Sequence, residues 1–76
     1  MNAQNRRDLE KALEIIEEGK SIIEYIKDEE QEKFDNLSEG LQQSEKGQKF
    51  GENVSNLESA ITDLESAIDS VNSSIE

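Results

Sequence analysis

Cysteine, histidine, proline and tryptophan are absent from this sequence, and aromatic residues amount to one tyrosine and two phenylalanines. Without cysteine the chain forms neither a disulfide nor a thiolate metal site. Without histidine it also lacks the commonest general base and metal ligand. The absence of proline leaves helices uninterrupted. These gaps favour a long-helix protein that is not an enzyme.

Two partial motifs lack essential members. Residues 35–40 match a calcium-binding loop at Asp35 and Gly40, but the third position is Leu37 and the twelfth, where a glutamate belongs, is Lys46. Carboxylate bundles that bind two metal ions use Glu-x-x-His, which this chain cannot supply. We therefore predict no catalytic residue, no metal site and no cofactor.

The chain is short and polar, with 76 residues, 32% hydrophobic residues and a mean hydropathy of −0.87. Its length limits it to a single domain, residues 1–76. No apolar run approaches the ~20 residues of a membrane span, and the polar residues 1–7 do not resemble a signal peptide. We expect a cytoplasmic protein.

Net charge is −11 and is unevenly distributed along the chain. Residues 1–49 hold 13 of the 19 acids and all 8 bases, so residues 50–76 hold the other six acids and no base. Direct nucleic-acid binding needs clustered lysine and arginine, and an acidic field repels anionic membranes. The charge thus favours a protein partner with a basic surface, without direct nucleic-acid or membrane contact.

The last third of the chain carries the clearest periodicity. Apolar residues alternate in steps of four and three, the spacing of a helix that packs a seam against another helix; they are Phe50, Val54, Leu57, Ile61, Leu64, Ile68, Val71 and Ile75. Within it the heptad beginning LESAI at residue 57 recurs at residue 64. We predict a helix over residues 44–75, with Ser44 or Asn36 as candidate caps.

The first half predicts a second helix, over residues 3–35, that Asn2 or Asn5 caps. Its apolar residues cover an arc of roughly 180°, too wide for one neighbour; they are Leu9, Ala12, Leu13, Ile15, Ile16, Ile22, Ile23 and Ile26. Gly19 lies within this arc. Because an interior glycine costs ~1 kcal/mol relative to alanine, it indicates either close approach of a second backbone or a tolerated weak spot.

Turn-forming residues over 36–43 predict a reversal between these helices. A hairpin centred near Gly40 pairs Leu9 with Val71, Ile16 with Leu64, Ile23 with Leu57, and Ile26 with Val54, and sets Gly19 against Ile61. The predicted fold is therefore an all-α antiparallel helical hairpin of two long helices.

A two-helix hairpin leaves part of the first helix's arc uncovered, so we predict a homodimer that forms a four-helix bundle. Its expected oligomer core is Leu9, Ile16, Ile23, Ile26, Leu57, Ile61, Leu64 and Ile68. Ala60, Ala67 and Ser74 form a strip of small residues where another helix can approach. A parallel coiled coil is the alternative, because β-branched residues alternate with leucine along the second seam, but Glu58 and Glu65 would lack basic partners in it.

Candidate partner-binding residues lie outside the predicted core. Tyr25 points away from the arc, near Arg7 and Lys11, a composition typical of binding hot spots; it is equally compatible with ordinary filler at a boundary position. Leu37 lies in the reversal, and loops on rigid scaffolds often carry recognition. The acidic second helix adds Glu58, Asp63 and Glu65.

Residues 27–47, KDEEQEKFDNLSEGLQQSEKG, together with the flanking helices and their LESAI repeats, resemble small acidic helical-hairpin accessory proteins of phages and mobile elements of Gram-positive bacteria. The resemblance implies such an accessory protein, in a bacterial cytoplasm, that acts on a host defence system.

Three functions are compatible with these observations. The leading hypothesis is an inhibitor or adaptor that binds a host protein through its acidic surface. An alternative is a sponge that sequesters a signalling nucleotide between protomers, which would need Arg6, Arg7, Lys11 or Lys20 to converge. The third is a purely structural oligomerisation module.

Overall fold

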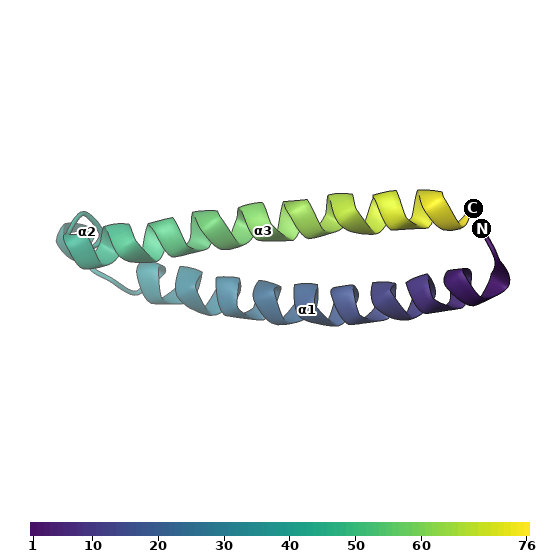
Figure 1. Cartoon of the computed structure of the whole chain (residues 1–76). Coiled ribbons are helices and arrows are strands. Elements are labelled where there is room, and N and C mark those ends of the chain that lie inside the picture. The colour runs from purple at the N-terminus through teal and green to yellow at the C-terminus, as the bar shows by residue number, and fades with distance from the viewer.

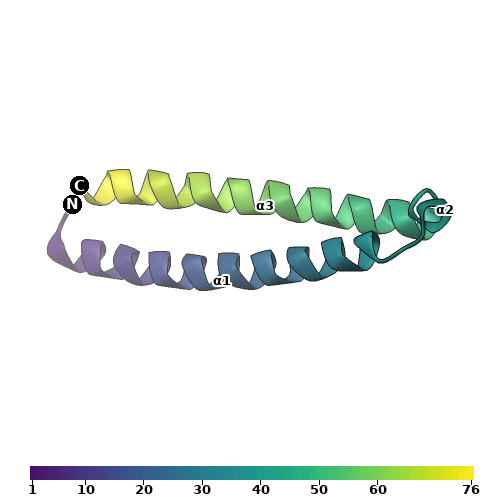
Figure 2. The same cartoon turned by 180° about the vertical axis from the view of Figure 1, so that it is seen from behind.

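Three helices account for nearly all of the computed structural model, which describes residues 1–76: α1 (Ala3–Asp35), α2 (Glu39–Gln42) and α3 (Glu45–Ile75). The long helices α1 and α3 lie side by side and antiparallel, with α2 at the reversal and both termini at the opposite end (Figures 1 and 2). The rod measures 58 × 15 × 13 Å. The predicted all-α helical hairpin is confirmed.

Side-chain caps explain where each helix begins. The Asn2 carboxamide oxygen accepts a hydrogen bond from the Asn5 amide at 2.7 Å, and the Ser38 and Ser44 hydroxyls accept from amides three residues on, at 3.4 and 3.3 Å. Each satisfies an amide that a helix start leaves without a partner. Asn36, a candidate cap for the second long helix, instead ends α1.

The reversal is built around Gly47, which is buried at the start of α3. A Cβ atom on Gly47 would collide with the backbone carbonyl oxygens of Leu41 and Gln42. From the other side, the Gln42 side-chain amide donates to the Phe34 carbonyl oxygen at 3.1 Å. The single turn of α2 is thereby held against both long helices.

The contact between α1 and α3 is a narrow seam. Val54, 7% exposed, is its one buried hydrophobic residue, and the other seam residues of α3 are half-buried. Among the half-buried positions of α1, one row follows the same alternating steps of four and three; it consists of Leu9, Leu13, Ile16, Lys20, Ile23, Lys27, Glu30 and Phe34. The α1 seam thus includes three charged side chains, and lysine stems can cover apolar surface while their ammonium groups reach outward.

The register of the hairpin differs from the predicted one by about one helical turn. Lys20 Nζ lies 3.4 Å from Glu65 Oε1, whereas a centre at Gly40 would place Lys20 opposite Ala60. Figure 1 shows the resulting stagger: α3 begins beyond the end of α1 at the α2 end, and α1 begins beyond the end of α3 at the other.

The cause is the extra turn of α2, which moves the centre of the hairpin toward Gln42. Leu9 is consequently level with Ile75 rather than Val71, and Ile23 with Ile61 rather than Leu57. The same register places Ile16 level with Ile68. The expected pairing of Ile26 with Val54 is wrong, because Ile26 is 41% exposed.

Candidate functional site

An apolar face of α1 is left uncovered by α3. Ile15, Ile22 and Ile26 are 59, 60 and 41% exposed, and on a wheel of about 100° per residue they lie roughly 90–130° from the centre of the seam. Gly19 lies between them, and a Cβ atom placed on it would meet nothing within 4 Å. We call Ile15, Gly19, Ile22 and Ile26 the isoleucine face.

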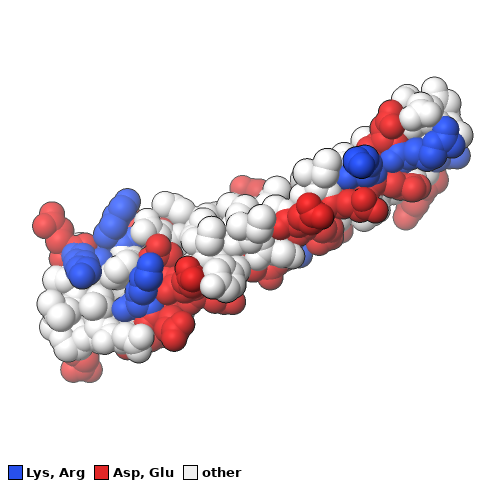
Figure 3. Space-filling model, turned by 90° about the horizontal axis from the view of Figure 1, so that it is seen from below, with Lys and Arg blue, Asp and Glu red and all other residues white.

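Figure 3 views the molecule from the α1 side. White atoms cover much of the middle of this side, and lysine and arginine side chains gather at the two ends. The predicted arc of α1 is therefore divided: α3 covers one part, and solvent covers the isoleucine face. Within the hairpin Gly19 has no neighbour that needs its small size.

The opposite flank of the hairpin is acidic. The Lys20–Glu65 ion pair crosses the seam and marks this flank on both long helices. On the same wheel of about 100° per residue, further carboxylates lie on that side of each seam; we call the set the acidic flank, and it comprises Glu17, Glu24, Glu58, Glu65 and Asp69.

Lys27 does not leave a free positive charge on the acidic flank. Its ammonium lies 3.1 Å from Asp28 Oδ1. The pKa of Lys27 is raised first by the hydrogen bond and charge of Asp28. Burial opposes this rise, and the charges of Glu58 and Glu24 add smaller increases. Lys20 and Lys27 are thus both engaged by carboxylates.

The small-residue strip lies on the other side of the molecule from the acidic flank. Ala60, Ala67 and Ser74 are roughly 70–110° from the centre of the α3 seam, on the side away from Glu65. In an antiparallel hairpin this is also the side of the isoleucine face. One flank is therefore acidic, and the other combines exposed isoleucines with small residues.

Tyr25 is exposed, as predicted, with 66% of its surface accessible. Its hydroxyl forms a hydrogen bond with the Glu29 carboxylate one turn on, and this bond, followed by the Glu29 charge, raises the pKa of Tyr25. Arg7 donates to the Gln4 side-chain oxygen at 3.0 Å, and Lys11 is exposed. Arg7 and Lys11 lie in the N-terminal part of α1, roughly four to five helical turns from Tyr25.

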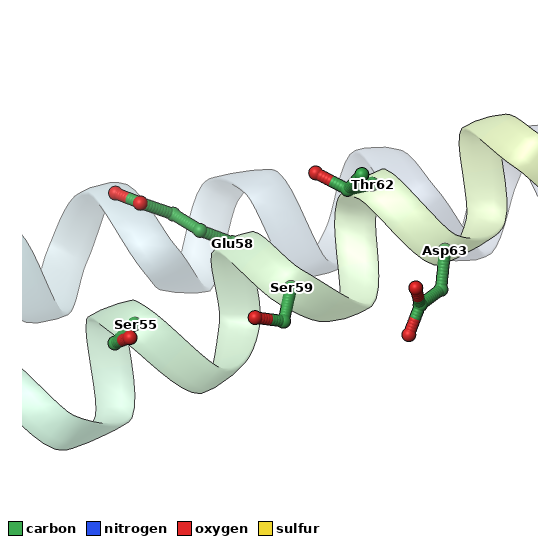
Figure 4. A pocket seen from close by; sticks show the side chains of 5 residues that line it. All are labelled: Ser55, Glu58, Ser59, Thr62 and Asp63. Atoms are coloured by element: carbon green, nitrogen blue, oxygen red, sulfur yellow. The ribbon is translucent and has the colours of Figure 1, made fainter.

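The other predicted partner-binding residues do not form one cluster. Glu58 and Asp63 line a shallow surface hollow with Ser55, Ser59 and Thr62, and all five side chains belong to α3, with α1 behind it (Figure 4). Glu65 is held by Lys20. Leu37 is half-buried in the segment between α1 and α2, far from the hollow and from Glu65.

Two further surface hollows are each confined to one helix: one is lined by residues of α3 alone, and the other by residues of α1 and its C-cap Asn36. All three have no hydrophobic lining residue, unlike the mostly apolar pockets that bury small ligands. No group of three or more side chains is placed to hold a metal ion. What the hairpin offers chemically is two extended surfaces.

The sequence reasoning did not place four residues where the structure has them: Lys20, Lys27 and Glu30 in the α1 seam, and Gly47 in the reversal. Lys20 was considered only as a candidate base for a nucleotide. One carboxylate oxygen of Glu30 is buried without a hydrogen-bond partner. A signal for the first three existed, because the alternating steps of the second seam also run through α1 when charged residues are allowed to occupy them. Gly47 carried no sequence signal, since its role depends on where α2 folds back.

No family model, curated protein or solved structure matches this chain. Neither long helix contains a stretch apolar enough to cross a membrane.

Proposed function

We propose that this protein is a non-enzymatic interaction protein that works as a homodimer of hairpins, with its acidic flank bound to a basic surface of a partner protein. The resemblance in the central run supports the further proposal that it is a phage or mobile-element accessory protein and that its partner is a host protein, with host defence as the leading process. The observation that carries the proposal is the division of one hairpin into an acidic flank and an apolar flank.

Self-association is supported by the exposed isoleucine face. Full burial of an isoleucine side chain contributes about 1.5–3 kcal/mol. A single hairpin leaves three isoleucines 41–60% exposed, and its one buried hydrophobic residue is Val54. A second hairpin that covers this face completes a four-helix bundle. Dimerisation on that flank also leaves the acidic flank accessible.

Partner binding is supported by the charge distribution. Lys20 and Lys27 are paired with carboxylates, so the acidic flank presents excess negative charge on a rigid, elongated surface. Such a field attracts a basic partner, speeds its association and weakens with added salt.

Affinity capture from host lysate with matched charge variants tests this proposal. We expect Glu24→Gln/Glu58→Gln/Asp69→Asn, which neutralises three residues of the acidic flank, to lose a stoichiometric partner that wild type retains at low salt. Glu14→Gln/Glu18→Gln/Glu32→Gln removes the same charge from the outward face of α1 and should retain it. Equal capture by both variants would contradict a role for the acidic flank.

A structural oligomerisation module is the second candidate, and the exposed isoleucine face favours it. In that case the dimer forms but no partner is captured by wild type at any salt concentration. A nucleotide sponge has less support, because one of its candidate bases, Lys20, is already bound to Glu65.

A further inference from the structure

We infer that the second hairpin docks antiparallel on the isoleucine face, about a two-fold axis that crosses α1 between Lys20 and Ser21. The occupant is a second copy of this chain. This inference rests on the proposed homodimer and specifies its direction and register, which the hydrophobic pattern alone leaves open.

The side of α1 that carries the isoleucine face is complementary to a second copy of itself only when the two helices run antiparallel. Positions on it follow the alternating steps of four and three that suit helix packing; they are Asp8, Ala12, Ile15, Gly19, Ile22, Ile26, Glu29 and Lys33. Across the inferred axis Ile15 faces Ile26 of the second copy, and Gly19 faces Ile22.

These pairings suit the shapes and charges of the side chains. The open space over Gly19 can receive the Ile22 side chain of the second copy. At both ends of the contact, Asp8 faces Lys33 of the other copy. A parallel arrangement would instead set Asp8 against Asp8 and Lys33 against Lys33, and like charges in contact are destabilising.

Residues of α3 point to the same two-fold axis. The hairpin register, set by the Lys20–Glu65 ion pair, places Lys20 level with Leu64, so an axis between Lys20 and Ser21 crosses α3 between Asp63 and Leu64. The midpoint between Ala60 and Ala67, two residues of the small-residue strip, lies at that same level, so Ala60 faces Ala67 of the second copy.

One heptad further from the axis, Ser74 of the strip faces Asn53 of the second copy. Two α3 helices can therefore approach closely where the two α1 helices interlock. The isoleucine face and the small-residue strip share one axis, although their residues lie on different helices.

Disulfide mapping tests the inference, because the chain contains no cysteine. Ile15→Cys and ¹⁵N-labelled Ile26→Cys are mixed, allowed to exchange subunits and mildly oxidised, and the products are identified by mass. We expect the mixed disulfide to dominate. In the inferred dimer each cysteine lies about 16 Å from its own copy, too far to bond.

Glu14→Cys replaces Ile15→Cys in the control, since residue 14 points outward and should give no mixed disulfide with Ile26→Cys. Light scattering of the wild type is run in parallel, with circular dichroism of each variant as a check on helix content. A wild type that stays monomeric would overturn the homodimer, and this inference with it.

A dimeric wild type allows two outcomes that overturn the inference alone. Disulfides that form mainly between two copies of the same variant, Ile15→Cys with itself or Ile26→Cys with itself, would indicate parallel helices. Absence of any disulfide in well-folded dimers would place the contact on another face.

Discussion

Among the glycines, Gly47 stands apart because the carbonyl oxygens of Leu41 and Gln42 occupy the place of a side chain. We expect Gly47→Ala to lower the free energy of unfolding by about 1–3 kcal/mol, as overpacking does. Gly51 lies one turn on in α3, and a Cβ atom added to it would meet nothing within 4 Å. Gly51→Ala should therefore raise the free energy of unfolding by up to about 1 kcal/mol.

Urea denaturation at one fixed protein concentration measures both changes. Two variants that shift in the same direction would show that α2 does not pack on Gly47. Both alanine substitutions improve helix propensity, but only Gly47→Ala introduces a collision with the backbone of α2. Comparing the two variants therefore separates these effects.

Glu30 is a seam residue of α1 whose burial lowers the stability of the hairpin. One carboxylate oxygen is buried without a hydrogen-bond partner, and such a group costs about 1–3 kcal/mol. We expect Glu30→Leu to stabilise the protein by about 1–2 kcal/mol. The exposed Glu32 provides the control, because Glu32→Leu removes the same charge from the same helix; an equal gain there would assign the effect to net charge.

The single tyrosine gives a direct reading of one surface interaction. Its hydrogen bond with Glu29 raises the pKa of Tyr25 above the ordinary value, so the bond stabilises the folded state fully below the ordinary pKa of about 10. That contribution is lost as pH rises through the raised pKa, and it is small because the side chain is exposed.

We expect Glu29→Gln to lower the pKa of Tyr25 toward its ordinary value. Absorbance of the tyrosinate reports it without interference, since the chain has no tryptophan. Glu32→Gln lies outside reach of the hydroxyl and should leave the titration unchanged. The same shift in both variants would point to the overall charge instead of the hydrogen bond.

At the scale of the helices, local chemistry was the part the sequence could predict. Asn2 and Ser44 are caps whose effect depends on the next three residues only. The regular steps from Phe50 to Ile75 likewise predict which side of α3 meets its neighbour. The wide arc of α1 correctly indicated that one helix could not cover it, and three isoleucines are left in solvent.

The register between α1 and α3 could not be predicted from the sequence, because it depends on how many residues the reversal takes up. A plain loop centred at Gly40 and a loop containing α2 differ by one helical turn, and the seams of both helices repeat closely enough to accept either. The ion pair of Lys20 with Glu65 distinguishes them. The two flanks follow from that register, so the candidate site could be predicted only as a set of residues, without their arrangement.

For the whole molecule, the proposed homodimer predicts a stability that depends on protein concentration. A dimer that is more stable than its separated hairpins unfolds at a temperature that rises with protein concentration. We expect that rise for the wild type, and we expect Ile22→Glu to abolish it, because a charge would be buried at the centre of the contact.

Leu41→Glu is the matched control, since Leu41 is equally apolar and exposed but lies on α2, outside the isoleucine face. It should keep the concentration dependence. Calorimetry over a hundredfold range of concentration measures the three proteins. A midpoint that does not move for the wild type, or that moves equally for Ile22→Glu, would mean that the exposed isoleucines of α1 serve a partner other than a second hairpin.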